Sequence, residues 1–315
     1  MAIPAALQNG LKLPVIAAPM FLVSGPELVT AACKAGVIGT FPALNQRTTE
    51  DYAQWLDEIK AALGPGDAAY GVNIIVHPTN PRVMADMQVT VEHEVPLVIT
   101  SLGAVRDVVD AVHGYGGLVF HDVTTVRHAK KAADAGADGL ILVCAGAGGH
   151  AGTWSPFALL NEVRRFYDGC IILSGCMSSG RDVATAMMLG ADFAYLGTRF
   201  ISTEESRAPD AYKQMIDEAK AADIVYTPAI SGIPANFMAQ SLVNNGLDPK
   251  ALPEKSKVDL GKELDHEVKA WKEVWSAGQG VGSIDDIPPT AELVARLKRE
   301  FDEANAAHAK KWVAA

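Results

Sequence analysis

The stretch Gly139-Leu-Ile-Leu-Val143 is followed directly by Cys144-Ala-Gly-Ala-Gly-Gly-His150-Ala-Gly-Thr-Trp154, and then by a helix-like segment at residues 156–167. An almost continuously apolar run is typical of a parallel strand that is covered on both faces. The stretch therefore predicts a strand, a glycine-rich loop and a helix in succession, which is one unit of an α/β fold. Glycine has no Cβ, so a flat ligand can approach this loop closely. Histidine is suited to proton transfer near neutral pH, which makes His150 the first candidate for catalysis.

The same unit recurs along the first two-thirds of the chain. Predicted strands span Val15–Met20, Ile38–Leu44, Tyr70–Val76, Leu97–Ser101, Leu118–Val123, Gly139–Val143, Ile171–Gly175 and Phe193–Phe200. Amphipathic helices are expected between them, for example at Pro26–Ala35, Thr49–Leu63, Val105–His113, Val126–Ala135 and Arg181–Leu189. Eight strands that are each followed by a helix predict a (β/α)8 TIM barrel. A doubly wound open sheet is the alternative, but no Gly-x-Gly-x-x-Gly motif follows the first strand.

The pattern changes after Phe200, where helical segments alternate with loops rich in proline and glycine. Helices are expected at Ala211–Ala221, Glu263–Trp275 and Thr290–His308. We therefore predict two parts. Residues 1–202 form the barrel core, and residues 203–315 form the last barrel helix and a helical extension that packs over the barrel mouth and contributes to the active site.

The composition excludes several classes of partner. The 315 residues carry a formal net charge of −10, which disfavours binding to nucleic acid or to an acidic membrane surface. No charged leader precedes an apolar segment at the start, and no apolar run approaches the ~20 residues that span a bilayer. The four cysteines show no metal-ligand spacing. The sequence predicts a cytoplasmic protein without a metal site.

Polar and small residues gather where the predicted strands end, which is where TIM barrels place their active sites. Strand one ends in Ala18-Pro19-Met20, a rigid turn. Asn73 interrupts the apolar third strand, so its amide is bonded either to the scaffold or to a ligand. Strand four ends in Thr100 and Ser101, and strand five in His121 and Asp122; these four side chains either line the pocket or cap it.

Two glycine turns follow the seventh and eighth predicted strands. The first contains Ser174-Gly175-Cys176 and the second Gly197-Thr198. Turns at these two places form the common phosphate site of this fold, with backbone N–H groups as donors. Together they predict a phosphorylated ligand such as flavin mononucleotide (FMN). Arg199 either pairs with that phosphate or forms a structural ion pair.

The order of these motifs resembles that of the nitronate monooxygenases. The resemblance rests on Ala147-Gly-Gly-His150-Ala-Gly152, Ser174-Gly175, Gly180-Arg181, Gly197-Thr-Arg-Phe200 and Trp275-Ser-Ala-Gly-Gln-Gly-Val-Gly282. It implies non-covalently bound FMN and His150 as the catalytic residue. It implies cofactor contacts from Ala18, Pro19, Met20, Asn73, Gly149, Ser174, Gly175, Cys176, Gly197, Thr198 and Gln279, and a substrate pocket that includes His121 and Ser276.

The resemblance also implies a reaction and leaves alternatives. Family members oxidise nitronates with O2 to a carbonyl compound and nitrite, and the substrate implied here is an alkyl nitronate, propionate 3-nitronate among the candidates. His150 would act either as a general base on a neutral nitroalkane or as a donor that stabilises the bound anion. The alternatives are an FMN-dependent NAD(P)H:quinone or enoyl-acyl-carrier-protein reductase of the same superfamily, and a flavin- or phosphate-binding barrel without turnover. A homodimer is left open.

Three departures from the family pattern concern the subgroup and the substrate. The residues before Gly-Gly-His are Val143-Cys-Ala-Gly-Ala147, and Gly175 is followed by Cys176 where many members have a second glycine. Asp122 stands where some relatives have a lysine on strand five.

Overall fold

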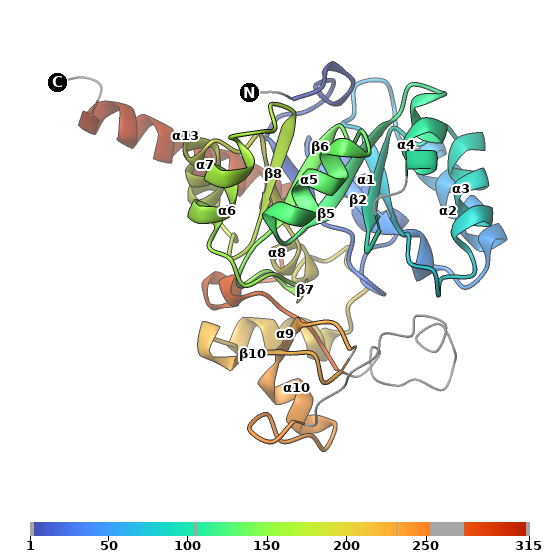
Figure 1. Ribbon diagram of the computed structural model, residues 1–315. Helices are drawn as coiled ribbons and strands as arrows, with labels where there is room; N and C mark the ends of the chain where they lie inside the picture. The colour runs from blue at the N-terminus through green and yellow to red at the C-terminus, as the bar shows by residue number, and fades with distance from the viewer. Residues whose placement is uncertain (1–2, 104–105, 231, 253–273, 313–315) are drawn as a thin grey trace.

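The computed structural model describes residues 3–103, 106–230, 232–252 and 274–312. Eight parallel strands close into a barrel in the order β1-β2-β3-β4-β5-β6-β8-β9. They span Val15–Ala17, Ile38–Pro42, Tyr70–Ile75, Leu97–Ser101, Leu118–Val123, Gly139–Val143, Cys170–Ser174 and Phe193–Leu196. Helices surround the strands (Figure 1). The predicted (β/α)8 barrel is confirmed.

The surrounding helices begin and end at the signals that the sequence provides. They are α1 (Pro26–Ala35), α2 (Thr49–Ala62), α3 (Val83–Glu92), α4 (Arg106–His113), α5 (Val126–Asp134), α6 (Pro156–Val163) and α7 (Gly180–Leu189). In α7 the side chain of Ser179 accepts from the amide of Asp182, and the Asp182 carboxylate accepts from the amide of Ser179, which forms a capping box. Gly36 and Gly190 end α1 and α7 in the left-handed conformation, which favours glycine.

Two predicted strands end earlier than expected, and one helix was not among those predicted. The last strand ends at Leu196, and the chain turns at Gly197 into the short helix α8 (Thr198–Ile201) instead of continuing to Phe200. The first strand ends at Ala17 instead of Met20. Helix α3 was not predicted, because its valines and threonine are weak helix formers. Burial of Met87 against the outer face of the sheet stabilises this helix in its tertiary context.

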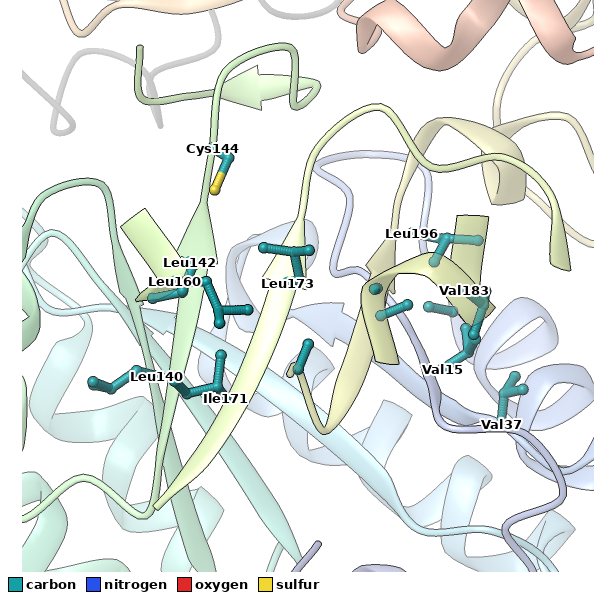
Figure 2. Close-up of a cluster of buried hydrophobic side chains, with 14 of the residues drawn as sticks. Val15, Val37, Leu140, Leu142, Cys144, Leu160, Ile171, Leu173, Val183 and Leu196 are labelled. Carbon is teal, nitrogen blue, oxygen red and sulfur yellow. The ribbon is translucent and has the colours of Figure 1, made fainter. Parts of the chain in front are cut away.

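The alternation of side chains along the strands creates two apolar layers. Successive side chains of a strand point to opposite faces of a sheet. Leu140 and Leu142 of β6 and Ile171 and Leu173 of β8 belong to one cluster with Leu160 and Val183 of the outer helices (Figure 2). The residues between them pack inside the barrel with residues of other strands. This inner cluster includes Ile16, Ile38, Leu97, Ile99, Phe120, Ile141, Ile172 and Phe193.

The region after residue 202 lies at one end of the barrel and then returns to its outer layer (Figure 1). It comprises α9 (Asp210–Glu218), β10 (Ile224–Thr227), β11 (Ala235–Met238), α10 (Ala239–Asn244) and α13 (Thr290–Trp312). Helix α13 packs against α7 and α1, which is the place of the eighth barrel helix. The division of the chain at residue 202 stays a prediction.

The sequence analysis predicted a helical extension, but the extension also contains strands. Strands β10 and β11 form an antiparallel sheet with the short strand β7 (Gly149–His150). The helix expected at Glu263–Trp275 falls almost wholly outside the described residues. Within the part of the chain that the structure describes, no helix has the length and apolar character needed to cross a bilayer.

The contact between α7 and α13 leads to a prediction about stability. A Cβ added to Gly180 would lie 2.0 Å from the backbone oxygen of Leu297 and 2.6 Å from the backbone nitrogen of Phe301. We therefore expect Gly180→Ala to force the two helices apart and to lower the free energy of unfolding by about 1–3 kcal/mol. Thermal and urea unfolding followed by circular dichroism measure this change.

Gly64→Ala is the matched control for Gly180→Ala. The nearest atom to its added Cβ, Oδ2 of Asp67, is 3.7 Å away, an ordinary contact. This variant should unfold within about 0.5 kcal/mol of the wild type. Equal stability of the two variants would show that the helix contact tolerates a methyl group.

Candidate active site

A cavity of about 1140 Å³ lies at the C-terminal ends of the barrel strands, between the barrel and the extension. It is lined by all but one of the residues proposed for the site. These are Ala18, Pro19, Met20, Asn73, His121, Gly149, His150, Ser174, Gly175, Cys176, Gly197, Thr198 and Ser276. Gln279 is the exception. Its backbone amide donates to the carbonyl of Gly146 at 2.8 Å, so it supports the glycine-rich loop without lining the cavity.

The loop with His150 is held in place by the extension. His150 pairs with Ala235 of β11, and Gly149 pairs with Asn236. The amide of Gly149, whose φ is +67°, donates to Oγ of Ser276 at 2.8 Å. A Cβ on Gly148 would lie 2.9 Å from the backbone nitrogen of Gly278, so the two segments approach more closely than any larger residue permits.

Two residues of the extension that support this loop were not identified from the sequence. Nδ2 of Asn236 donates to the carbonyl of Ala147 at 2.7 Å. The hydroxyl of Tyr212 donates to the carbonyl of Ser276, and its ring stacks on Trp275 with 4.9 Å between centroids. These contacts join residues far apart in the chain, and no local motif signals them.

Burial sets the protonation state of His150. Desolvation lowers the pKa of its imidazole to about 4. The ring is therefore neutral at neutral pH, because burial disfavours the charged form. A neutral imidazole can accept a proton from a carbon acid or donate one N–H, but it supplies no positive charge. This state fits the role of a general base.

The turns after β8 and β9 face the cavity with backbone amides. Within the described residues, the amides of Gly175, Cys176 and Gly197 donate no hydrogen bond. Such amides at adjacent turns are suited to bind an anion. Arg199 does not contribute to this site. Its side chain is 3% exposed and pairs with Asp286 of the extension at 3.0 Å, which settles the two alternatives in favour of a structural ion pair.

A row of polar side chains points into the barrel at the same end. Phe120 belongs to the inner cluster, so Asp122, two residues further along β5, also points inward. Ser101 Oγ donates to Oδ2 of Asp122 at 2.5 Å, and Nδ2 of Asn73 donates to Ser101 Oγ at 2.7 Å. Burial raises the pKa of Asp122 to about 6. Asn73 is thus bonded to the scaffold, and it also lines the cavity.

His121 lies on the other face of β5. Its Nδ1 is 2.7 Å from Oγ1 of Thr100, a residue of β4 that also points away from the barrel interior. Burial, together with the positive charges of His128 and Lys131, lowers the pKa of His121 to about 4. The residue borders the cavity, but Asp122 is the side chain of this pair that points into the barrel.

Comparison with known proteins identifies the family of this site. The family model described as nitronate monooxygenase matches residues 44–300. The chain belongs to the nitronate monooxygenase family. A nitronate monooxygenase of Paraburkholderia phytofirmans is 27% identical, over 94% of each chain. Among solved structures, nitroalkane oxidase from Streptomyces ansochromogenes has a TM-score of 0.82 and 26% identity, covering 96% of this chain and 100% of that one. FabK from Thermotoga maritima has a TM-score of 0.78 and 25% identity, covering 96% of each chain.

Membership of the nitronate monooxygenase family makes this protein an oxidoreductase. The resemblance predicted from the ordered glycine and histidine motifs is confirmed. The roles of the individual cavity residues are not fixed by membership, so they enter the proposal below.

Proposed function

We propose that this protein is an FMN-dependent nitronate monooxygenase that oxidises alkyl nitronates with O2 to a carbonyl compound and nitrite. The observation that supports this function is that one cavity contains both His150 and two turns whose backbone N–H groups donate no hydrogen bond within the described residues. The first is suited to the acid–base chemistry of a nitroalkane and the second to the phosphate of a flavin nucleotide. Propionate 3-nitronate is one candidate substrate.

The residues at the mouth fit an FMN phosphate. The amides of Gly175, Cys176 and Gly197 would donate to its oxygens. A Cβ on Gly197 would meet no protein atom within 3.6 Å, so this position faces space that a ligand can fill. Ala18, Pro19, Met20 and Asn73 border the same space and would contact the ring system. The bound flavin would supply the electron transfer and the reaction with oxygen.

The side chains of the protein would bind the substrate and move a proton. A nitronate is already a carbanion, so it needs no base, whereas a neutral nitroalkane must first lose its α-proton. His150, neutral at pH 7, would accept that proton at its imidazole. Ser276 and Trp275 of the extension line the cavity and would limit the access of water to the reacting atoms.

Anaerobic mixing of the purified yellow protein with single reductants tests this function. Heat denaturation should first release a flavin with the chromatographic mobility of FMN. Propane 2-nitronate and propionate 3-nitronate, added separately, should bleach the flavin, and nitrite should form when oxygen is admitted. Rapid bleaching by NADH with no response to either nitronate would identify a reductase instead. Protein that binds no flavin on reconstitution, or whose flavin no donor reduces, would be a binding protein.

A further inference from the structure

The inward-facing side chains of Asn73, Ser101 and Asp122 form a hydrogen-bonded set, here called the acid network. All three line the cavity. Nδ2 of Asn73 donates to the carbonyl of Ile99 at 3.2 Å and to Ser101 Oγ at 2.7 Å, and Ser101 Oγ donates to Asp122 Oδ2 at 2.5 Å. The bond to Ile99 fixes the orientation of the amide, since a carbonyl oxygen can only accept.

A count of hydrogens shows what the acid network can offer to a ligand. Asn73 has two N–H groups and Ser101 has one O–H. With Asp122 ionised, all three hydrogens are used within the protein, so the network has only acceptors and a negative charge to present. One added proton on Oδ2 of Asp122 makes this oxygen the donor to Ser101 Oγ, which leaves the hydroxyl hydrogen of Ser101 free for donation into the cavity. The network therefore changes from acceptor to donor on binding a single proton.

The surroundings of Asp122 favour the protonated form. Oδ1 is buried and has no hydrogen-bond partner among the described residues, and no basic side chain lowers the pKa of this carboxyl group. An ionised carboxylate in such a place is costly because burial removes its hydration without replacing it. A bound cofactor would exclude further water from the carboxyl group.

We propose that the acid network is the proton-uptake site of the bound flavin: Asp122 takes up one proton from solvent when the flavin accepts two electrons, and the network then donates a hydrogen bond to the reduced ring. This inference rests on the flavin of the proposed function. The two electrons come from the reducing substrate and two protons come from water, one to the ring and one to Asp122, so both negative charges gained on reduction are compensated. Hydrogen bonds and charge near the ring nitrogens are the means by which proteins tune flavins.

Burial moves the pKa values of the other cavity groups whose pKa is shifted away from neutrality. His121 and His150 have pKa values lowered to about 4 by burial, and the pKa of Tyr195 is raised well above its usual value. On α5, Arg127 and Lys131 line the mouth as cations, and burial and these cations lower the pKa of His128. Asp122, with a pKa of about 6, is the cavity group poised to change its protonation near neutrality.

The midpoint potential of the flavin as a function of pH tests this inference. Below about pH 6 Asp122 is already protonated, so reduction adds no proton to this carboxyl group there. Above about pH 6, the wild type should take up one more proton per two electrons than Asp122→Asn. If the variant takes up one proton and the wild type two, the potential of the wild type should fall about twice as steeply with pH. The asparagine amide keeps a neutral donor and does not titrate. The two potentials should converge below about pH 6 and separate above it.

Two further variants complete the experiment. Asp122→Ala removes the titrating group and releases the hydroxyl hydrogen of Ser101 from its bond to Asp122, so its potential should change with pH with the same slope as that of Asp122→Asn. Thr100→Val removes a neighbouring buried hydroxyl that contacts His121 on the outward face, and it should keep the wild-type slope. Equal slopes for the wild type and Asp122→Asn would overturn the inference.

Infrared difference spectroscopy of the wild type makes the test independent of the variants. Photoreduction at about pH 7 should produce a new band of a protonated carboxylic acid, as expected for a group with a pKa of about 6. No such band would also overturn the inference. A flavin that NADH but not nitronates reduces would refute the proposed function and leave these expectations intact, whereas protein without flavin would refute both.

Discussion

His150→Ala should lower the rate on neutral nitroalkanes by roughly 10²–10⁴-fold, the usual contribution of a general base. The imidazole is neutral at pH 7 because burial holds its pKa at about 4, so it is ready to accept the α-proton. Preformed nitronates have already lost this proton, and their turnover should fall much less. Steady-state rates of nitrite formation from 2-nitropropane and from propane 2-nitronate, compared at matched flavin content, measure the difference.

The alternative role of His150 predicts another outcome. If the ring mainly stabilises the bound anion through its N–H, both substrate forms should suffer, with a raised KM for the nitronate. The exposed His308 on α13 provides the control, and His308→Ala should keep wild-type rates on both forms. Unchanged kinetics in His150→Ala would remove the residue from the mechanism.

The pH profile of the neutral substrate provides a second readout of the same base. A histidine whose pKa is lowered remains an active base down to that pKa. The rate should therefore stay level from neutrality to about pH 5 and fall below about pH 4, instead of falling from the ordinary histidine value of about 6.5. His150→Ala should lose this acid limb.

The barrel was predictable because each strand is buried on both faces. Runs such as Leu140–Val143 and Ile171–Leu173 are apolar throughout, which only a strand covered on both sides requires. The mouth was harder to predict. Strand β7 has two residues, and its partner β11 lies more than eighty positions later in the chain, so no local periodicity indicates the pairing. The end of β9 was misplaced because Gly197, Thr198 and Arg199 continue a sequence that is compatible with a strand.

The candidate site also has features that could be predicted from the sequence and features that could not. Glycines after the seventh and eighth barrel strands mark places where the backbone approaches a ligand, and the structure brings them to the same cavity as His150. The inward orientation of Asp122 follows from that of Phe120, which the structure and not the sequence establishes. Phe120 points inward in a strand of period two, so Asp122 does as well. The contacts of Ser276 and Asn236 depend on how the extension folds back, which the sequence does not reveal locally.

Gly197→Val should weaken FMN binding by roughly 10–100-fold while the fold is retained. The structure gives Gly197 a φ of −104°, which a valine can adopt. The three atoms nearest to an added Cβ are Ala18 Cβ at 3.6 Å and Sδ and Cγ of Met20 at 3.7 and 3.8 Å, all ordinary contacts. The protein thus has room for the valine side chain. That side chain would fill part of the cavity beside the backbone N–H of Gly197, which donates no hydrogen bond to the described residues.

The size of this effect follows from the hydrogen bond that would be lost. A bond from an amide to a charged phosphate contributes about 1.5–3 kcal/mol, which corresponds to roughly 10–100-fold in affinity. Quenching of flavin fluorescence by the apoprotein gives the dissociation constant, and circular dichroism reports on folding. Gly66→Val, at a loop glycine with no atom within 4 Å of its added Cβ, should change neither. If Gly197→Val retained full FMN affinity, Gly197 would be only a turn residue, and the phosphate would have to lie at Gly175 and Cys176 alone.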